Sequence, residues 1–139
     1  MATRERNESQ IQTDITIYGA TSFVARHVLN YTADLSPSLP RKFKVTLAGR
    51  NESKVKDVLA TFEPIMKVKG SIVALDVVVA TNTDTAALTT MASRSRVILN
   101  CAGPFALYSS GVVQACAETG CDYVDITGEG LFVFAGMLC

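Results

Sequence analysis

Small and hydroxyl-bearing residues follow an apolar segment near the amino end of the chain, in a pattern suited to holding a phosphate. Residues 14–26 (DITIYGATSFVAR) indicate a short strand, a tight turn at Gly19 and the start of a helix. The spacing Gly19-x-x-Ser22-x-x-Ala25 keeps one of the three glycines of the dinucleotide fingerprint. Backbone amides near Thr21 would face a phosphate, helped by the helix dipole. The alternative is an ordinary strand-to-helix turn with a capping residue.

A second group with cofactor chemistry is Arg50-Asn51, which follows the apolar residues 43–48. An acidic residue at this place would accept from the ribose of NAD, whereas arginine suits the 2′-phosphate of NADP. We expect Asn51 to cap the helix that follows and to contact the same phosphate. The alternative for Arg50 is a solvated side chain at a strand end.

Residues 100–105 (NCAGPF) form a third polar turn after an unbroken apolar segment. Asn100, Cys101, Gly103 and Pro104 would border the ribose and nicotinamide, with Gly103 allowing close approach and Pro104 turning the chain away from the sheet. No histidine or acid is placed to activate Cys101, so we interpret it as a lining thiol. The sequence therefore offers no convincing catalytic pair.

Acidic residues end two further apolar segments. Asp76 would accept a hydrogen bond from the adenine amino group, or it is an ordinary turn aspartate. Asp125 and Glu129 flank the end of the last predicted strand, either where a substrate domain would begin or as caps for the next helix. Metal ligation there has little support, because the chain has a single histidine, His27.

The elements that must position these residues alternate strand and helix. We expect strands at 15–18, 43–48, about 71–76, 97–101 and 123–126, and helices after Gly19, over 51–64 with Pro64 near its end, over 82–93 and over 109–119. We expect Tyr31 on the buried face of the first helix. Near-continuous apolar strands favour parallel pairing covered on both faces. The pattern predicts an α/β, Rossmann-like, doubly wound parallel sheet in three layers, with its ligand at the carboxyl ends of the strands.

Composition narrows the classes of function. The chain has 139 residues, which is enough for one domain. Its net charge is zero and it has no basic stripe, so nucleic acid is not an expected partner. No apolar run approaches the ~18 residues that span a bilayer, and the amino end is too polar for a signal peptide. The four cysteines lack metal-site spacing and suit the cytosol or another reducing compartment.

Four motifs in order (IYGATSF, LAGRN, LNCAGPF and YVDITGE) resemble the NADP-binding domain of the saccharopine dehydrogenase-like oxidoreductases, relatives of trans-acting enoyl reductases. The resemblance implies a Rossmann fold, NADP(H), oxidoreductase chemistry and a link to lipid or glycolipid metabolism. For some members it implies association with lipid droplets, mitochondria or the membrane periphery.

Carried onto this sequence, the resemblance implies particular site residues. Gly19, Thr21, Ser22 and Phe23 would form the phosphate turn, although the family usually has glycine where Ser22 stands. Arg50 would bind the 2′-phosphate, and residues 100–104 would line the nicotinamide side.

The expected organisation is a flexible arm at 1–13, the cofactor domain at 14–129 and an atypical apolar tail at 130–139. Members of the family continue into a substrate domain, which we expect to be absent from this chain, so we expect cofactor binding without appreciable turnover. Two alternatives remain: a non-catalytic interaction module that keeps the fold, and a truncated product without function of its own.

Overall fold

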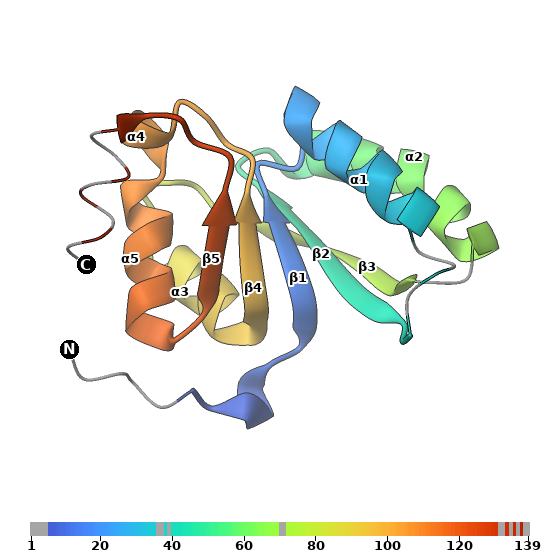
Figure 1. Ribbon diagram of the computed structural model, residues 1–139, viewed down its shortest axis with the longest axis horizontal. Coiled ribbons are helices and arrows are strands. Elements are labelled where there is room, and N and C mark those ends of the chain that lie inside the picture. Colours follow the sequence, from blue (N-terminus) through green and yellow to red (C-terminus); the bar gives the residue numbers. More distant parts are fainter. Residues whose placement is uncertain are drawn as a thin grey trace.

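A parallel sheet forms the centre of the fold (Figure 1). The computed structural model describes residues 6–35, 38, 40–69, 72–130, 133, 135 and 137, and among these residues five strands pair in the order β3-β2-β1-β4-β5. Every pairing is parallel. The strands are β1 (Thr13–Tyr18), β2 (Phe43–Gly49), β3 (Ile72–Val79), β4 (Ser95–Asn100) and β5 (Asp122–Asp125).

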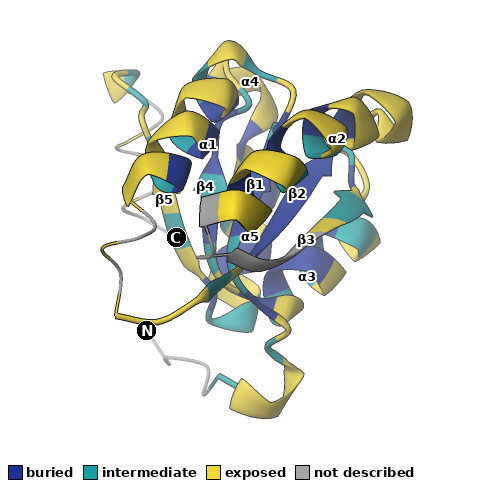
Figure 2. Cartoon of the chain, turned by 90° about the vertical axis from the view of Figure 1, so that its right-hand side faces the viewer, coloured by how far each residue is buried: buried dark blue, intermediate teal, exposed yellow. Residues whose placement is uncertain are grey.

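Helices cover both faces of this sheet. A short 3-10 turn, η1 (Glu8–Gln10), precedes the helices α1 (Phe23–Leu35), α2 (Glu52–Lys69), α3 (Thr85–Arg94), α4 (Phe105–Tyr108) and α5 (Ser110–Thr119). One buried cluster joins α1 and α2 to the sheet, and a second joins α3 and α5 to its other face. Figure 2 shows the strands buried between helices whose outer surfaces are exposed. The predicted Rossmann-like sheet in three layers is confirmed.

The central strand β1 shows why the strands of this sheet are rich in apolar residues. In β1, Ile17 is 2% exposed and belongs to the α1–α2 side, whereas Tyr18 is 4% exposed and packs on the α3–α5 side. Both faces of the strand are therefore buried, as parallel sheets require. The buried residues Ala25, Leu29 and Ala33 recur every fourth position along α1 and form the face of that helix that packs on the sheet.

Several predicted boundaries are wrong by a few residues, and the ends of β3 and α2 are the two with a clear physical reason. β3 continues through Val77 to Val79, so Asp76 lies inside the strand rather than at its end. The three valines favour extended backbone, and their β propensity outweighs the charge at Asp76. Likewise α2 passes through Pro64 to Lys69. Phe62 and Met66, on the turns flanking Pro64, are 6% and 1% exposed, so packing holds the helix together across the proline.

One predicted core position is also wrong. Tyr31 is 65% exposed, because it stands two residues beyond the buried Leu29 and therefore almost opposite to it around α1.

The two ends of the chain are described only in part. From residue 6 onward, the Arg6 guanidinium donates to the carbonyl of Ser95, and the Gln12 amide donates to the carbonyl of Arg94 at 2.8 Å. In the tail, Val133 and Met137 are 41% and 78% exposed, and most of the remaining tail lies outside the described residues. Of the helices in the described ranges, none has the length and apolar character needed to cross a membrane.

Candidate functional site: a cleft at the carboxyl ends of the strands

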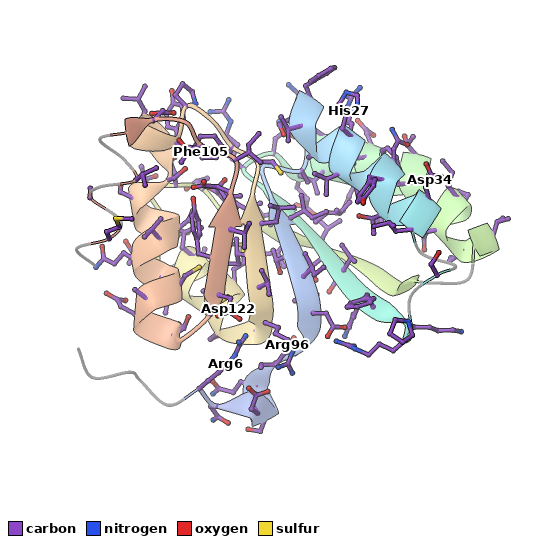
Figure 3. The ribbon with its side chains drawn as sticks, in the orientation of Figure 1. Arg6, His27, Asp34, Arg96, Phe105 and Asp122 are labelled. Carbon is purple, nitrogen blue, oxygen red and sulfur yellow. The ribbon has the colours of Figure 1, made fainter. Side chains whose placement is uncertain are left out.

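The turns that follow β1, β2 and β4 meet in one cleft, beside the loop after β3. Its volume is about 250 Å³. It is lined by Tyr18, Gly19, Thr21, Ser22, Gly49, Arg50, Asn82, Cys101, Ala102, Gly103 and Tyr108. In Figure 3, Phe105 marks the end of the sheet where this cleft lies, and Arg6, Arg96 and Asp122 mark the opposite end. The position agrees with the predicted ligand edge of a doubly wound sheet.

Gly19 makes the first turn sharp enough to enter the cleft. Its φ of +74° lies in the left-handed region, which side chains disfavour. A Cβ at this position would stand 2.7 Å from both the Cβ and the amide nitrogen of Ala102. The turn after β1 therefore touches the turn after β4, and only glycine permits the contact.

The start of α1 presents backbone donors beside this turn. The Ser22 hydroxyl accepts from the Ala25 amide at 3.1 Å, so Ser22 caps the start of α1. Within the described ranges, the amides of Thr21, Phe23 and Val24 have no acceptor. Such amides, with the helix dipole behind them, are the usual donors to a phosphate.

Phe23 and His27 lie on the outer surface of α1. The Phe23 side chain is 77% exposed, and its ring meets the His27 ring edge-on at 4.5 Å between centroids. Only the backbone of Phe23 is placed to take part in the cleft.

Arg50 is the cation of the cleft. Its side chain is exposed, and it forms no salt bridge with any described residue. Asn51 accepts from the Lys54 amide at 3.0 Å through its Oδ1, so its predicted capping of the helix is confirmed. Arg50 and Asn51 also border a second, more open hollow over the start of α2.

Tyr18 is a lining residue that the sequence does not reveal. Burial raises the pKa of its phenol, and the charge of Arg50 opposes that rise. The hydroxyl has no hydrogen-bond partner among the described residues, although the side chain is 4% exposed. Its place at the end of an apolar strand made it resemble a core residue. A buried hydroxyl without a partner is costly, so a bound water or ligand would satisfy it.

Asn100 supports the third turn from below. It is 0% exposed, and its Oδ1 accepts from the Ala102 amide at 2.9 Å. Its Nδ2 donates to the Ser109 hydroxyl at 2.7 Å and to the Tyr123 hydroxyl at 3.0 Å. The sequence places Asn100 beside the ligand, whereas the structure uses its side chain to shape the loop.

The rest of this loop reaches the cleft. Cys101 and Gly103 line it, and Pro104 follows a cis peptide bond and precedes α4. Burial raises the pKa of the Cys101 thiol to about 11, so the thiol is protonated and unreactive at neutral pH.

Asp76 does not join the other candidates. It pairs with Thr46 inside the sheet and borders a separate hollow of about 370 Å³ beside α3. Because β3 extends to Val79, the loop that reaches the cleft contributes Asn82 instead. Asn82 could have been found by placing the strand end after the valines. Tyr108 enters from α4, a short helix that the sequence pattern does not predict.

A family model for the saccharopine dehydrogenase NADP-binding domain matches residues 15–131. The chain belongs to this family. The resemblance carried by its four motifs is therefore confirmed, and NADP(H) is the cofactor of the domain.

Relatives of this chain include oxidoreductases and a lipid droplet protein. It is 36% identical to a trans-acting enoyl reductase of Mycobacterium leprae, over 86% of this chain and 26% of that protein. It is 33% identical to a lipid droplet localized protein of Caenorhabditis elegans, over 86% and 27%. It is also 33% identical to a probable mitochondrial saccharopine dehydrogenase-like oxidoreductase of Arabidopsis thaliana, over 86% and 26%. The chain thus spans about a quarter of the length of these relatives.

Solved structures support the fold. Apo saccharopine dehydrogenase (L-Glu forming) from Saccharomyces cerevisiae aligns with a TM-score of 0.58 at 18% identity, over 88% of this chain and 24% of that one. A short-chain type dehydrogenase/reductase from Mycobacterium ulcerans aligns with a TM-score of 0.61 at 13% identity, over 84% and 51%. Both likenesses concern the Rossmann-like sheet alone.

The residues of the cleft fit this cofactor. Among the residues that the structure describes, the amides at the start of α1 have no acceptor and the Arg50 guanidinium after β2 has no salt-bridge partner. A pyrophosphate and a 2′-phosphate are the groups that such donors bind.

Proposed function

We propose that this chain binds NADP(H) in the cleft at the carboxyl ends of β1, β2 and β4. The pyrophosphate would lie at the amides of Thr21, Phe23 and Val24, with Ser22 beside it. Arg50 and Asn51 would bind the 2′-phosphate, and residues 101–104 would border the nicotinamide. The observation that supports this most strongly is Arg50, a cation without a salt-bridge partner in the described chain, in the same cleft as the α1 amides.

The bound cofactor would supply a hydride, and the chain's own residues would bind and orient it. The described lining of the cleft includes no histidine, aspartate or glutamate. Hydride transfer also needs the nicotinamide held against a substrate. We therefore propose that this chain binds the cofactor without appreciable turnover by itself, and that an oxidoreductase reaction requires a substrate domain like that of the longer relatives.

The substrate class and cellular site are part of the same proposal. Relatives bear the names trans-acting enoyl reductase and lipid droplet localized protein, and a further one is called mitochondrial. These names support a role in lipid metabolism at a lipid droplet or at a mitochondrion.

Titrating NADPH with the chain and following the cofactor's fluorescence tests the proposal. We expect saturable binding that is tighter for NADPH than for NADH, because NADH lacks the 2′-phosphate. Replacing Arg50 with alanine should weaken NADPH binding roughly tenfold or more, since a bidentate charged contact is lost, and leave NADH binding nearly unchanged. Absence of saturation at millimolar NADPH would refute the proposal.

A non-catalytic interaction module is the second candidate, and Ser22 is the observation that favours it. The dinucleotide-binding fingerprint has a glycine at this position, which lets the backbone approach a pyrophosphate. If Ser22→Gly raises NADPH affinity by a large factor, the natural site is a weakened one and the second candidate gains support. If the variant binds no more tightly, Ser22 is compatible with the cofactor and the first proposal stands.

A further inference from the structure

A chain of hydrogen bonds connects the cleft loop to the segment after β5. It begins at the buried Asn100, whose Oδ1 holds the Ala102 amide and whose Nδ2 donates to the Tyr123 hydroxyl. That hydroxyl donates in turn to Asp125 Oδ2 at 2.7 Å. Burial and the Asp125 carboxylate both raise the pKa of Tyr123, so the phenol keeps its proton and remains a donor.

The connection continues along the backbone after β5. The Thr127 amide donates to Asp125 Oδ1 at 3.0 Å, and the Glu129 amide donates to the Thr127 hydroxyl at 3.0 Å. These two contacts fold the segment back, so that the side chain of Glu129 reaches α4. Figure 1 shows this last, red segment lying against α4 at the end of the sheet.

Glu129 completes the circuit. Its Oε1 accepts from the Phe105 amide at 2.8 Å and its Oε2 accepts from the Ala106 amide at 2.9 Å. One prediction from the sequence is that Glu129 caps the next helix, whereas its side chain caps the preceding short helix, α4. Two charge-assisted contacts from one carboxylate fix both position and orientation.

The circuit holds the cleft loop at both of its ends. Asn100 fixes Ala102 at the start, and Glu129 fixes Phe105 and Ala106 just after Pro104. Between these points lies Gly103, and α4 carries Tyr108, both of which line the cleft. The nicotinamide side of the cleft therefore depends on residues that do not line it.

We propose that Asp125 and Glu129 are positioning residues for the nicotinamide half of the site. This inference rests on the proposed binding of NADP(H). Releasing the circuit would loosen residues 102–108, of which Ala102, Gly103 and Tyr108 line the cleft, and would leave Arg50 and the start of α1 in place. A ligand that occupies only the adenosine half would then be unaffected.

Two ligands measured on the full 139-residue chain separate the halves of the site. We expect Glu129→Ala to weaken NADPH binding by about tenfold, because the loop must be reordered on binding, and to change the affinity for 2′,5′-ADP by less than about twofold. Glu129→Gln keeps an acceptor for one amide, so its loss should be intermediate. Asp125→Asn should resemble Glu129→Gln.

Glu63→Ala is the matched control, since Glu63 forms an exposed pair with Lys67 on α2, and it should alter neither affinity. Amide hydrogen exchange gives a readout without ligand. In Glu129→Gln, exchange at Phe105 and Ala106 should accelerate several-fold, whereas exchange at the buried Ala115 should not.

The outcomes are distinct. Equal weakening of NADPH and 2′,5′-ADP would show general destabilisation and overturn the positioning role. The positioning role would also be overturned if the wild-type chain binds NADPH and both Glu129 variants bind it with unchanged affinity. A wild-type chain that binds neither ligand would overturn the proposed function and this inference together.

Discussion

Two tyrosine hydroxyls near the cleft have opposite surroundings. Tyr123 both donates to Asp125 and accepts from Asn100, whereas the buried hydroxyl of Tyr18 has no partner in the described residues. Removing a hydroxyl that forms hydrogen bonds leaves its partners unsatisfied, whereas removing a hydroxyl without hydrogen bonds leaves no partner unsatisfied. The same substitution should therefore have opposite consequences at these two positions.

We expect Tyr123→Phe to lower the free energy of unfolding by about 2 kcal/mol, and Tyr18→Phe to leave it unchanged or to raise it. Urea titration followed by circular dichroism measures both. Tyr18→Phe should also weaken NADPH binding if the cofactor supplies the missing acceptor. A clear loss of stability in Tyr18→Phe would mean that its hydroxyl has a partner in the free protein.

Gly19→Ala tests the contact between the two turns. Alanine would have to adopt the left-handed backbone conformation of Gly19, and its Cβ would press on the backbone of Ala102. We expect a loss of about 2–4 kcal/mol in unfolding free energy, from strain and displacement together. Gly128→Ala is the control, because nothing lies within 4 Å of its Cβ position, and it should have almost no effect.

At this scale the sequence predicts residues whose chemistry is local. Gly19, Ser22 and Asn51 lie in the turns after β1 and β2, and their turn or capping roles can be worked out from neighbours along the chain. Asn100 and Glu129 could not be assigned in this way. Their distant partners are Ser109 between α4 and α5, Tyr123 on β5 and two amides of α4. No local pattern specifies which distant groups a side chain will meet.

Among the elements, α2 contains an unusual feature in Pro64. Proline cannot donate to the helix, and its ring crowds the preceding turn. The helix continues because Phe62 and Met66 are buried on either side. Local propensity therefore predicts that α2 ends at Pro64, whereas tertiary packing sustains the helix beyond it. In the same way, β3 continues past the charged Asp76.

We expect Pro64→Ala to stabilise the protein by about 1–3 kcal/mol, since Pro64 is exposed and alanine restores the missing donor. A rise in the midpoint of thermal unfolding would show it. Glu63→Ala on the adjacent exposed position should produce a much smaller change. A lower midpoint in Pro64→Ala would mean that the kink itself is needed for α2 to pack.

Across the whole molecule, the end of the sheet opposite the cleft has its own electrostatic connection. Asp14 on β1 accepts from Arg41 Nη2 at 2.8 Å and from the Lys44 amide at 3.0 Å. The hydrogen bond from Arg41 is the main reason that the pKa of Asp14 lies below its ordinary 3.8. Desolvation opposes this shift, while the Lys44 amide and the charges of Arg41 and Arg96 add to it.

This lowered pKa gives stability a definite pH dependence. Because the folded-state value is below the unfolded one, the contribution is complete above 3.8 and disappears as the pH falls through the folded-state value. We expect the urea concentration at the unfolding midpoint to decrease as the pH is lowered below 3.8. Asp14→Asn should make this decrease with pH smaller, and it should lower stability at pH 7. If Asp14→Asn showed the same acid slope as the wild type, other carboxylates would be responsible.

The order of the strands has a consequence for synthesis. β1 is made early and becomes the central strand; one edge pairs with β2, but the other must wait for β4, where Thr13 lies opposite Ser95. As the chain leaves the ribosome, β1, β2 and β3 are complete while that second edge still exposes its backbone groups. Until β4 emerges, β1 is the strand to which a neighbouring nascent chain would most readily add.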